Sequence, residues 1–150
     1  MTATDRLAPL LTVPVPAHEA PFLDLVEGRP GSRGRVQDFW ESGGGAGVYD
    51  LVLAAGDRVR GWVPRPLGGT LLRAFYEVAQ RLDLVGGEVV LDLACGPGPL
   101  TRHLAAGVGP EGLVIGADLS PAMLARAARE VRAENTVFVR ADAMALPLRD

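Results

Sequence analysis

VVLDLACGPGPLT, residues 89–101, is the stretch that decides the fold of this 150-residue chain. An apolar run with β-branched residues predicts a buried strand over Val89–Leu93. Gly96 and Gly98 then allow a tight turn that no side chain obstructs, and a helix is expected to begin near Leu100. A strand, a glycine turn and a helix start in this order form a nucleotide-binding device, because the first N–H groups of the helix face the ligand.

Downstream, helical and strand patterns alternate. Ser120 offers a capping hydroxyl and Pro121 suits the first position of a helix, so a helix start is predicted there. Strand–helix–strand–helix–strand spacing predicts an α/β, Rossmann-like parallel sheet with right-handed crossovers. The predicted elements are a strand over Val89–Leu93, a helix over Leu100–Ala106, a strand over Leu113–Ala117, a helix from Pro121 to about Arg132, and a strand over Val137–Val139.

Upstream, the chain divides into an arm at residues 1–30 and a helical lead-in at residues 31–84, ahead of the sheet at residues 85–150. Prolines recur through the arm and predict an extended, partly disordered segment, with a short helix over residues 21–27. The glycine-rich residues 43–47 lack the preceding strand and following lysine of a phosphate loop, so they are interpreted as a hinge.

The lead-in itself shows two helical stripes. The first runs from Val48 to Trp62 at three- and four-residue steps. The second begins after Thr70. Its predicted buried face consists of Leu71, Phe75, Val78, Ala79 and Leu82.

The amino-acid composition excludes several classes of function. Fifteen basic and eighteen acidic residues give a net charge of −3, which argues against a nucleic-acid surface. The one cysteine, Cys95, excludes an internal disulfide and a multi-cysteine zinc site, and fits a reducing cytoplasm. No apolar run approaches the length of a membrane span, and the N-terminus does not read as a signal peptide.

Three carboxylates follow the three predicted strands: Asp92, Asp118 and Asp142. Because parallel strands end at one edge of a sheet, these acids are expected to converge beside the glycine turn. Asp118 suits a ribose diol, to which a carboxylate offers two acceptors, and Asp142 would lie near a purine amine. Each acid alone fits a helix cap or a turn equally well. Three of them around one glycine turn favour a ligand site.

These stretches resemble the class I, Rossmann-like family of S-adenosylmethionine-dependent methyltransferases over about residues 84–150. Residues 90–98, 116–124 and 140–150 look like its first three motifs. Upstream, Val48-Tyr49-Asp50-Leu51 and Arg60-Gly61-Trp62 are similar to the lead-in of quinone-biosynthesis-type methyltransferases. The resemblance implies S-adenosylmethionine as cofactor and a set of cofactor-binding residues: Tyr49, Asp92, Ala94, Cys95, Gly96, Gly98, Asp118, Leu119, Met123, Asp142 and Ala143.

The resemblance also implies roles. The glycine turn lines the methionine and ribose, Asp118 holds the ribose hydroxyls, and Leu119 packs on the adenine. Asp142 and the Ala143 N–H read the adenine edge, and Tyr49 helps to close the pocket. Ala94 stands where the family commonly has glycine, a mild change provided that its φ stays negative. The resemblance implies no catalytic residue and no metal ligand in this chain.

The implied activity is methyl transfer to a small-molecule acceptor, which the acidic charge balance and the quinone-type lead-in favour. Two other classes stay open. A non-catalytic S-adenosylmethionine-binding module or split-enzyme subunit would keep the same pocket. A nicotinamide dehydrogenase fits less well, because Thr101 stands where its fingerprint requires a third glycine.

The family's sheet has seven strands in the order 3-2-1-4-5-7-6, and this chain supplies strands three, two and one. Val89–Leu93 is therefore expected to be an edge strand with unpaired N–H and C=O groups. On this basis we expect a fragment, a truncated chain or half of a split enzyme. Its partner would be a complementing C-terminal half or a second copy in a homo-oligomer.

Overall fold

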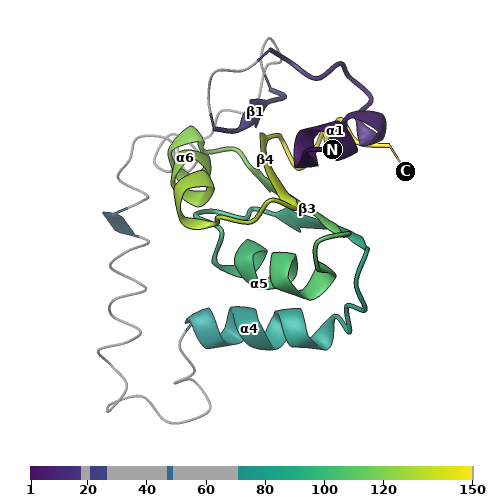
Figure 1. The fold of residues 1–150 in the computed structure, drawn as a ribbon. Coiled ribbons are helices and arrows are strands. Elements are labelled where there is room, and N and C mark those ends of the chain that lie inside the picture. Colours follow the sequence, from purple (N-terminus) through teal and green to yellow (C-terminus); the bar gives the residue numbers. More distant parts are fainter. Residues whose placement is uncertain (18–20, 27–46, 49–70, 150) are drawn as a thin grey trace.

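The computed structural model describes residues 1–17, 21–26, 47–48 and 71–149 (Figure 1). Its named strands form one parallel sheet in the order β1-β4-β3-β2. The elements are, in chain order, α1 (Ala3–Leu7), the 3-10 helix η1 (Ala8–Leu10), β1 (Leu23–Asp24), α4 (Leu71–Arg81), β2 (Val89–Leu93), α5 (Pro99–Val108), β3 (Leu113–Asp118), α6 (Pro121–Glu130) and β4 (Thr136–Arg140).

The predicted α/β architecture is confirmed. β2 has the predicted bounds. β3 is one residue longer than predicted at its carboxyl end, and β4 is one residue longer at each end. In the parallel register, Val90 lies beside Val114 and Ile115 beside Val137. The carboxyl ends of these strands therefore fall at one edge of the sheet.

The residues before α5 and α6 determine where these two helices begin. Gly98 precedes α5 with φ 82, and a Cβ there would lie 2.6 Å from Val131, so only glycine fits. The Ser120 side chain caps α6 by accepting a hydrogen bond from the Met123 N–H at 3.4 Å. α5 runs through Gly107 to Val108, two residues beyond its predicted end, whereas α6 stops at Glu130 instead of near residue 132.

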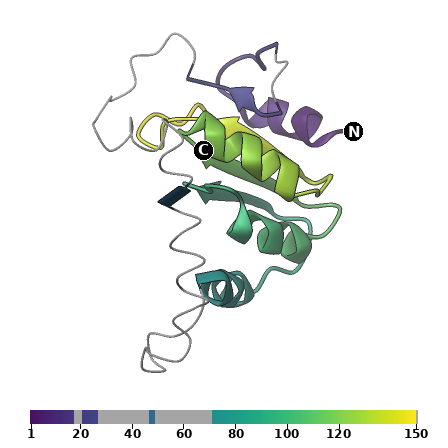
Figure 2. The ribbon, with the colours of Figure 1, turned by 90° about the vertical axis from the view of Figure 1, so that its left-hand side faces the viewer.

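Alternate residues of the strands face opposite layers. Val114 packs with α5 and Phe138 packs with α6 on one face of the sheet. On the other face Ile115 and Val139 pack with Leu7 of α1. Figure 1 shows α6 and α1 on opposite sides of β4, and Figure 2 looks onto the side that carries α6. The sheet is thus covered on both faces where β3 and β4 lie.

The expectation of an extended, partly disordered arm is wrong for its first residues. The Thr2 side chain and the Asp5 carboxylate form a reciprocal capping box that starts α1. Leu7 and Leu11 are fully buried against the sheet, and Leu11 bridges to Leu148. Hydrophobic burial against strands more than a hundred residues away orders this segment. The local proline pattern does not reveal these distant contacts.

The helix predicted over residues 21–27 is also wrong in the part described. Leu23 and Asp24 form the short strand β1, which pairs in parallel with Val139 and Arg140. Leu23 is buried in the same core as α1. Because the far edge of β4 offers unpaired backbone groups, an extended segment satisfies more hydrogen bonds there than one helical turn could.

The second lead-in helix exists as α4, but its predicted buried face is only partly right. Ala79 is buried, whereas Val78 and Leu82 are about half exposed. Among the described elements α4 packs along α5, where the Tyr76 ring meets the His103 ring edge to face. The buried stripe of α4 is thus narrower than its periodicity suggested. The helix predicted from Val48 to Trp62 lies almost wholly outside the described residues.

β2 is an edge strand among the residues that the structure describes, as expected. It pairs with β3 only, and Val89 and Leu93 are 55% and 47% exposed. An edge of this kind carries unpaired N–H and C=O groups that favour pairing with a further strand.

None of the helices in the described part of the chain has the length and apolar character needed to cross a membrane. The same part of the chain also holds no group of three or more His, Cys, Asp or Glu residues arranged to bind a metal ion.

Candidate functional site

The glycine turn after β2 and the acid at the end of β3 are joined at the carboxyl edge of the sheet. The Cys95 N–H donates to the Ala117 carbonyl at 3.0 Å, and the Ala141 N–H donates to the Asp118 carbonyl at 3.1 Å. The Gly96 N–H donates to Asp118 Oδ2 at 2.9 Å. The convergence of the turn and Asp118 that the sequence predicts is thus present.

The Asp118 carboxylate lies between two backbone donors. Its Oδ1 accepts a hydrogen bond from the Ser120 N–H at 2.8 Å, and its Oδ2 accepts the one from Gly96. A carboxylate has about four acceptor positions, so about two remain for a ligand. A Cβ built on Gly96 would meet no atom within 4 Å, which leaves the space beside the turn open. The site therefore offers fixed acceptors beside an unobstructed backbone.

Asp92 lies near the end of β2, as its sequence suggested, but its side chain is engaged inside the fold. It is buried and accepts a hydrogen bond from the fully buried Thr101 hydroxyl at 2.5 Å. Burial raises the pKa of this carboxyl, the Thr101 hydrogen bond lowers it, and the nearby Asp118 charge raises it, with a raised pKa as the result. Asp92 thus ties the end of β2 to the start of α5, beneath the turn.

Asp92→Asn should raise the free energy of unfolding at neutral pH. Because the folded-state pKa is raised, the stability that Asp92 contributes is present below its ordinary pKa and is lost as pH rises through the raised value. Asparagine keeps an oxygen for Thr101 and carries no charge, so its advantage should grow as pH rises through the raised pKa of Asp92, to the order of 1 kcal/mol. Urea unfolding of both proteins at acidic and at neutral pH measures it. A variant less stable at neutral pH would contradict the account.

Ala94 departs from the condition set for it. Its φ is +57°, in the left-handed region, and Gly96 and Gly98 follow with φ 54 and φ 82. The turn therefore alternates left-handed positions at 94, 96 and 98, and the first of them carries a side chain. A Cβ in this conformation costs roughly 1–2 kcal/mol. The condition under which alanine would be a mild change, a negative φ, is therefore not met.

Ala94→Gly should stabilise the protein by about 1 kcal/mol, because glycine adopts a positive φ without strain. Ala106→Gly is the matched control. Ala106 lies exposed within α5, so the same change there should destabilise by about 0.5–1 kcal/mol. Thermal and urea unfolding give both values. Equal losses in the two variants would show that Ala94 is not strained.

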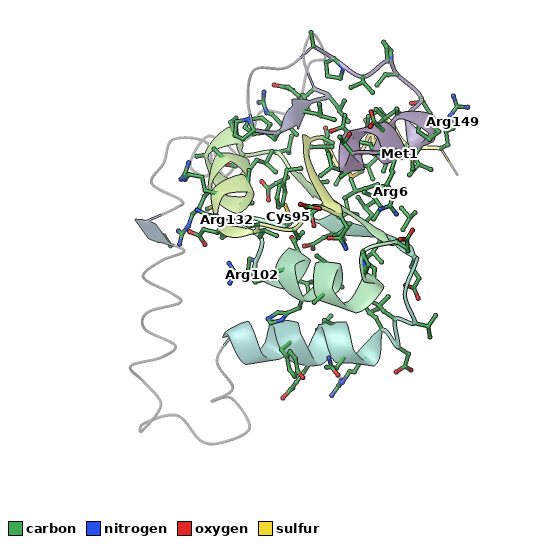
Figure 3. All side chains as sticks on the ribbon, viewed as in Figure 1. Met1, Arg6, Cys95, Arg102, Arg132 and Arg149 are labelled. Carbon is green, nitrogen blue, oxygen red and sulfur yellow. The ribbon has the colours of Figure 1, made fainter. Side chains whose placement is uncertain are left out.

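Two further predicted cofactor residues, Cys95 and Met123, have buried side chains like that of Asp92. Cys95 packs in the core with Leu124 and Phe138, in the interior seen in Figure 3, and burial raises the pKa of its thiol. Met123 is buried as well, near the start of α6. The Cys95 N–H is already bonded to Ala117. Cys95 therefore supports the turn from the core side.

Asp142 forms its own turn after β4. Its Oδ1 accepts the Met144 N–H and its carbonyl accepts the Ala145 N–H, each at 2.9 Å. Asp142 is therefore a turn residue, one of the roles that its sequence position allowed. Ala143 is exposed beside it. Contact of Asp142 and Ala143 with an adenine stays a prediction, as does the role of Tyr49, which lies outside the described residues.

Sequence reasoning missed two polar residues that fix the chain around the sheet, and of these only Arg140 lies at the carboxyl edge. The Asn135 amide donates to the carbonyls of Ala105 and Gly109, at 2.9 and 2.7 Å, and so closes the end of α5. Arg140, the last residue of β4, donates to the Leu119 carbonyl at 3.0 Å. Asn135 directly before a strand was a usable signal for a capping or turn role, whereas nothing local to Arg140 identified its partners.

A cavity of about 480 Å³ lies elsewhere, between β1, the end of α6 and the first residues of β4. Phe22, Val131 and Thr136 are among the residues that line it. β4 begins at Thr136 and ends at Arg140, so the cavity lies toward the amino end of the strand, away from the acids. Because convergent polar groups define a site better than volume does, the carboxyl edge is the stronger candidate.

Residues 90–150 match the family described as "Methyltransferase domain". Demethylmenaquinone methyltransferase of Lactobacillus johnsonii is 41% identical over 75 residues, 47% of this chain and 31% of that protein. Trans-aconitate 2-methyltransferase of Mycobacterium tuberculosis is 46% identical over 56 residues, 37% of this chain and 21% of that protein. A solved S-adenosylmethionine-dependent methyltransferase from Aquifex aeolicus aligns over 51% of this chain and 42% of its own, with 26% identity and a TM-score of 0.47.

The parallel sheet with a glycine turn and acids at its carboxyl edge defines a Rossmann-like nucleotide-binding fold. Residues 90–150 belong, more particularly, to a class I S-adenosylmethionine-dependent methyltransferase domain. Membership of this family implies use of S-adenosylmethionine. The chain spans about a third of the length of the demethylmenaquinone methyltransferase that it matches, 31%.

Proposed function

We propose that this chain binds S-adenosylmethionine at the carboxyl edge of its sheet, as the cofactor-binding part of an enzyme that methylates a small molecule. One observation carries the proposal. The Asp118 carboxylate is fixed beside an open glycine turn, in a segment that matches a methyltransferase domain.

The residues present fit such a cofactor. The acceptor positions left on Asp118 suit the two hydroxyls of a ribose, and the open space at Gly96 allows close approach to the backbone. Leu119 is half-buried next to Asp118 and offers an apolar contact for an adenine. Asp142 and the exposed Ala143 would supply polar contacts to the adenine edge.

Bound S-adenosylmethionine supplies a methyl group already activated on a sulfonium. The tasks left to the protein are to orient the cofactor and to exclude water around it. Asp118 and the glycine turn perform the first task by fixing the ribose and the adjoining chain. A base is required only for a weakly nucleophilic acceptor, and we assign none to this chain.

A small-molecule acceptor is supported by two observations. The chain has a net charge of −3, which does not favour a nucleic-acid substrate. The names of its relatives refer to demethylmenaquinone, 2-phytyl-1,4-naphtoquinone and trans-aconitate, all of them small molecules. We place the reaction in the cytoplasm, with the acceptor pocket shared with a complementing half or a second copy.

A non-catalytic cofactor-binding module is the second candidate. It is supported by β2, which pairs on one side only among the strands that the structure describes. A nicotinamide dehydrogenase is less suitable. Thr101, where a dinucleotide site has its third glycine, is fully buried and its hydroxyl is bonded to Asp92.

Calorimetric titration of the 150-residue chain with S-adenosylmethionine, S-adenosylhomocysteine and NAD separates these functions. The proposal predicts saturable binding of the first two and none of NAD. Transfer of a labelled methyl group to a soluble quinol, assayed with the same protein, then separates an enzyme from a binding module. Binding of NAD alone would contradict the proposal.

A further inference from the structure

Arg140 spans two segments far apart in the sequence. Its Nε donates to the Leu119 carbonyl and its Nη1 donates to Asp24 Oδ2, each at 3.0 Å. The other Asp24 oxygen accepts the Val26 N–H at 3.0 Å. The Leu25 N–H in turn donates to the Arg140 carbonyl at 2.9 Å. Both the backbone and the side chain of Arg140 are thus engaged by the N-terminal segment.

These contacts lie at the level of the cofactor site. In the sheet register Asp24 lies beside Arg140, and Arg140 lies beside Asp118, so the three residues form one row across β1, β4 and β3. The row ends at the acid whose two oxygens accept the Gly96 and Ser120 N–H groups. Leu119, whose carbonyl receives Arg140, is the residue between Asp118 and Ser120.

The ion pair is more than an exposed surface contact. The Arg140 and Asp24 side chains are 23% and 35% exposed. An exposed pair alone is worth little, because water and salt screen it. Here the planar guanidinium also donates in a second direction to a backbone carbonyl, a geometry that the single ammonium of lysine does not reproduce. The Asp24 carboxylate therefore orients the Arg140 guanidinium, which holds the turn through the Leu119 carbonyl.

We propose that Arg140, oriented by Asp24, is a positioning residue that holds the 118–120 turn in its cofactor-binding geometry. Docking of the N-terminal strand β1 is thereby coupled to the site. The inference rests on the proposed function in one respect only: the ligand whose affinity the turn controls is S-adenosylmethionine.

The first test uses the full chain without ligand. Amide hydrogen exchange is measured by NMR in wild type, Asp24→Asn, Arg140→Gln and Arg140→Lys. Exchange at the Gly96 and Ser120 N–H groups, both bonded to Asp118, should accelerate by about 3- to 10-fold in all three variants, the scale of one lost hydrogen bond. Exchange within α5 should stay at the wild-type rate. Unchanged exchange at Gly96 and Ser120 overturns the proposal.

The second test measures S-adenosylmethionine affinity by calorimetry in the same variants. The dissociation constant should rise by about 3- to 10-fold in each, and the double variant Asp24→Asn, Arg140→Gln should lose little more than either single one. Glu130→Gln is the matched control, because it breaks the Arg126–Glu130 pair on α6, with its side chains 25% and 45% exposed. Its affinity should equal that of wild type.

The outcomes separate the two proposals. Wild type that binds no S-adenosylmethionine refutes the proposed function, and the exchange rates still decide the positioning role. Faster exchange with unchanged affinity overturns the positioning role, since the turn would then be structural only. Wild-type exchange rates and affinity in Arg140→Lys overturn it too, because a positive charge would then hold the turn without the two-directional donors of the guanidinium.

Discussion

Asp118→Ala is expected to weaken S-adenosylmethionine binding by about 1.5–3 kcal/mol, which is roughly 10- to 150-fold in the dissociation constant. The change removes the charged acceptor proposed for the ribose hydroxyls. It also leaves the Gly96 and Ser120 N–H groups without their partner. Calorimetric titration at a temperature where circular dichroism shows the variant to be folded measures the loss.

Two further variants make this result specific. Asp118→Asn keeps one carbonyl oxygen for the backbone donors and should lose affinity to an intermediate degree. Glu111→Gln removes an exposed carboxylate near the opposite end of β3 and should bind like wild type. An Asp118→Ala protein that binds with wild-type affinity would refute the ribose assignment.

Leu7→Ala should destabilise the fold by about 2–4 kcal/mol, the usual cost of emptying a fully buried leucine position. Leu7 lies in α1 and packs on the sheet face formed by residues such as Ile115 and Val139. The free energy of unfolding in urea measures the effect. A loss this large would show that the N-terminal segment is part of the folded core.

Leu10→Ala supplies the comparison, because Leu10 is only partly buried against the same cluster. Its loss should be clearly smaller, near 1 kcal/mol, in proportion to the apolar area removed from contact. If both variants were within about 0.5 kcal/mol of wild type, the surface-substitution scale, α1 would not be docked on the sheet.

The sheet could be predicted because its signals are local. Val89–Leu93 is a run of apolar and β-branched residues, broken only by Asp92, that leads into a glycine turn, and β2 has those bounds. Ser120 and Pro121 mark the start of α6 in two adjacent residues. Chain chirality and parallel pairing then bring the strand ends to one edge, so the approach of Asp118 to the glycine turn follows from the sequence alone.

The N-terminal segment could not be predicted, because its order comes from distant partners. Leu7 and Leu11 are buried by strands that the local pattern does not reveal, and Pro9 lies within η1 at a helix-compatible position. The pairing of Asp24 with Arg140 spans a separation of 116 residues. Composition around either residue predicts only an ordinary charged side chain.

Within the site, positions were predicted better than roles. Asp92 is at the end of its strand as expected, yet its carboxylate is buried against Thr101 and supports the turn. Cys95 likewise directs its side chain into the core. The sign of φ at Ala94 depends on how three successive turn positions alternate, which residue identity alone left open.

The central claim is that S-adenosylmethionine binds where the glycine turn meets Asp118. An amide NMR titration of the 150-residue chain with S-adenosylhomocysteine, the demethylated cofactor, tests it most directly. The account predicts saturable shifts at Gly96, Gly98, Ser120 and Ala143, with the residues around Thr136 unmoved. Shifts confined to the cavity at the amino end of β4, or none at saturating ligand, would contradict it.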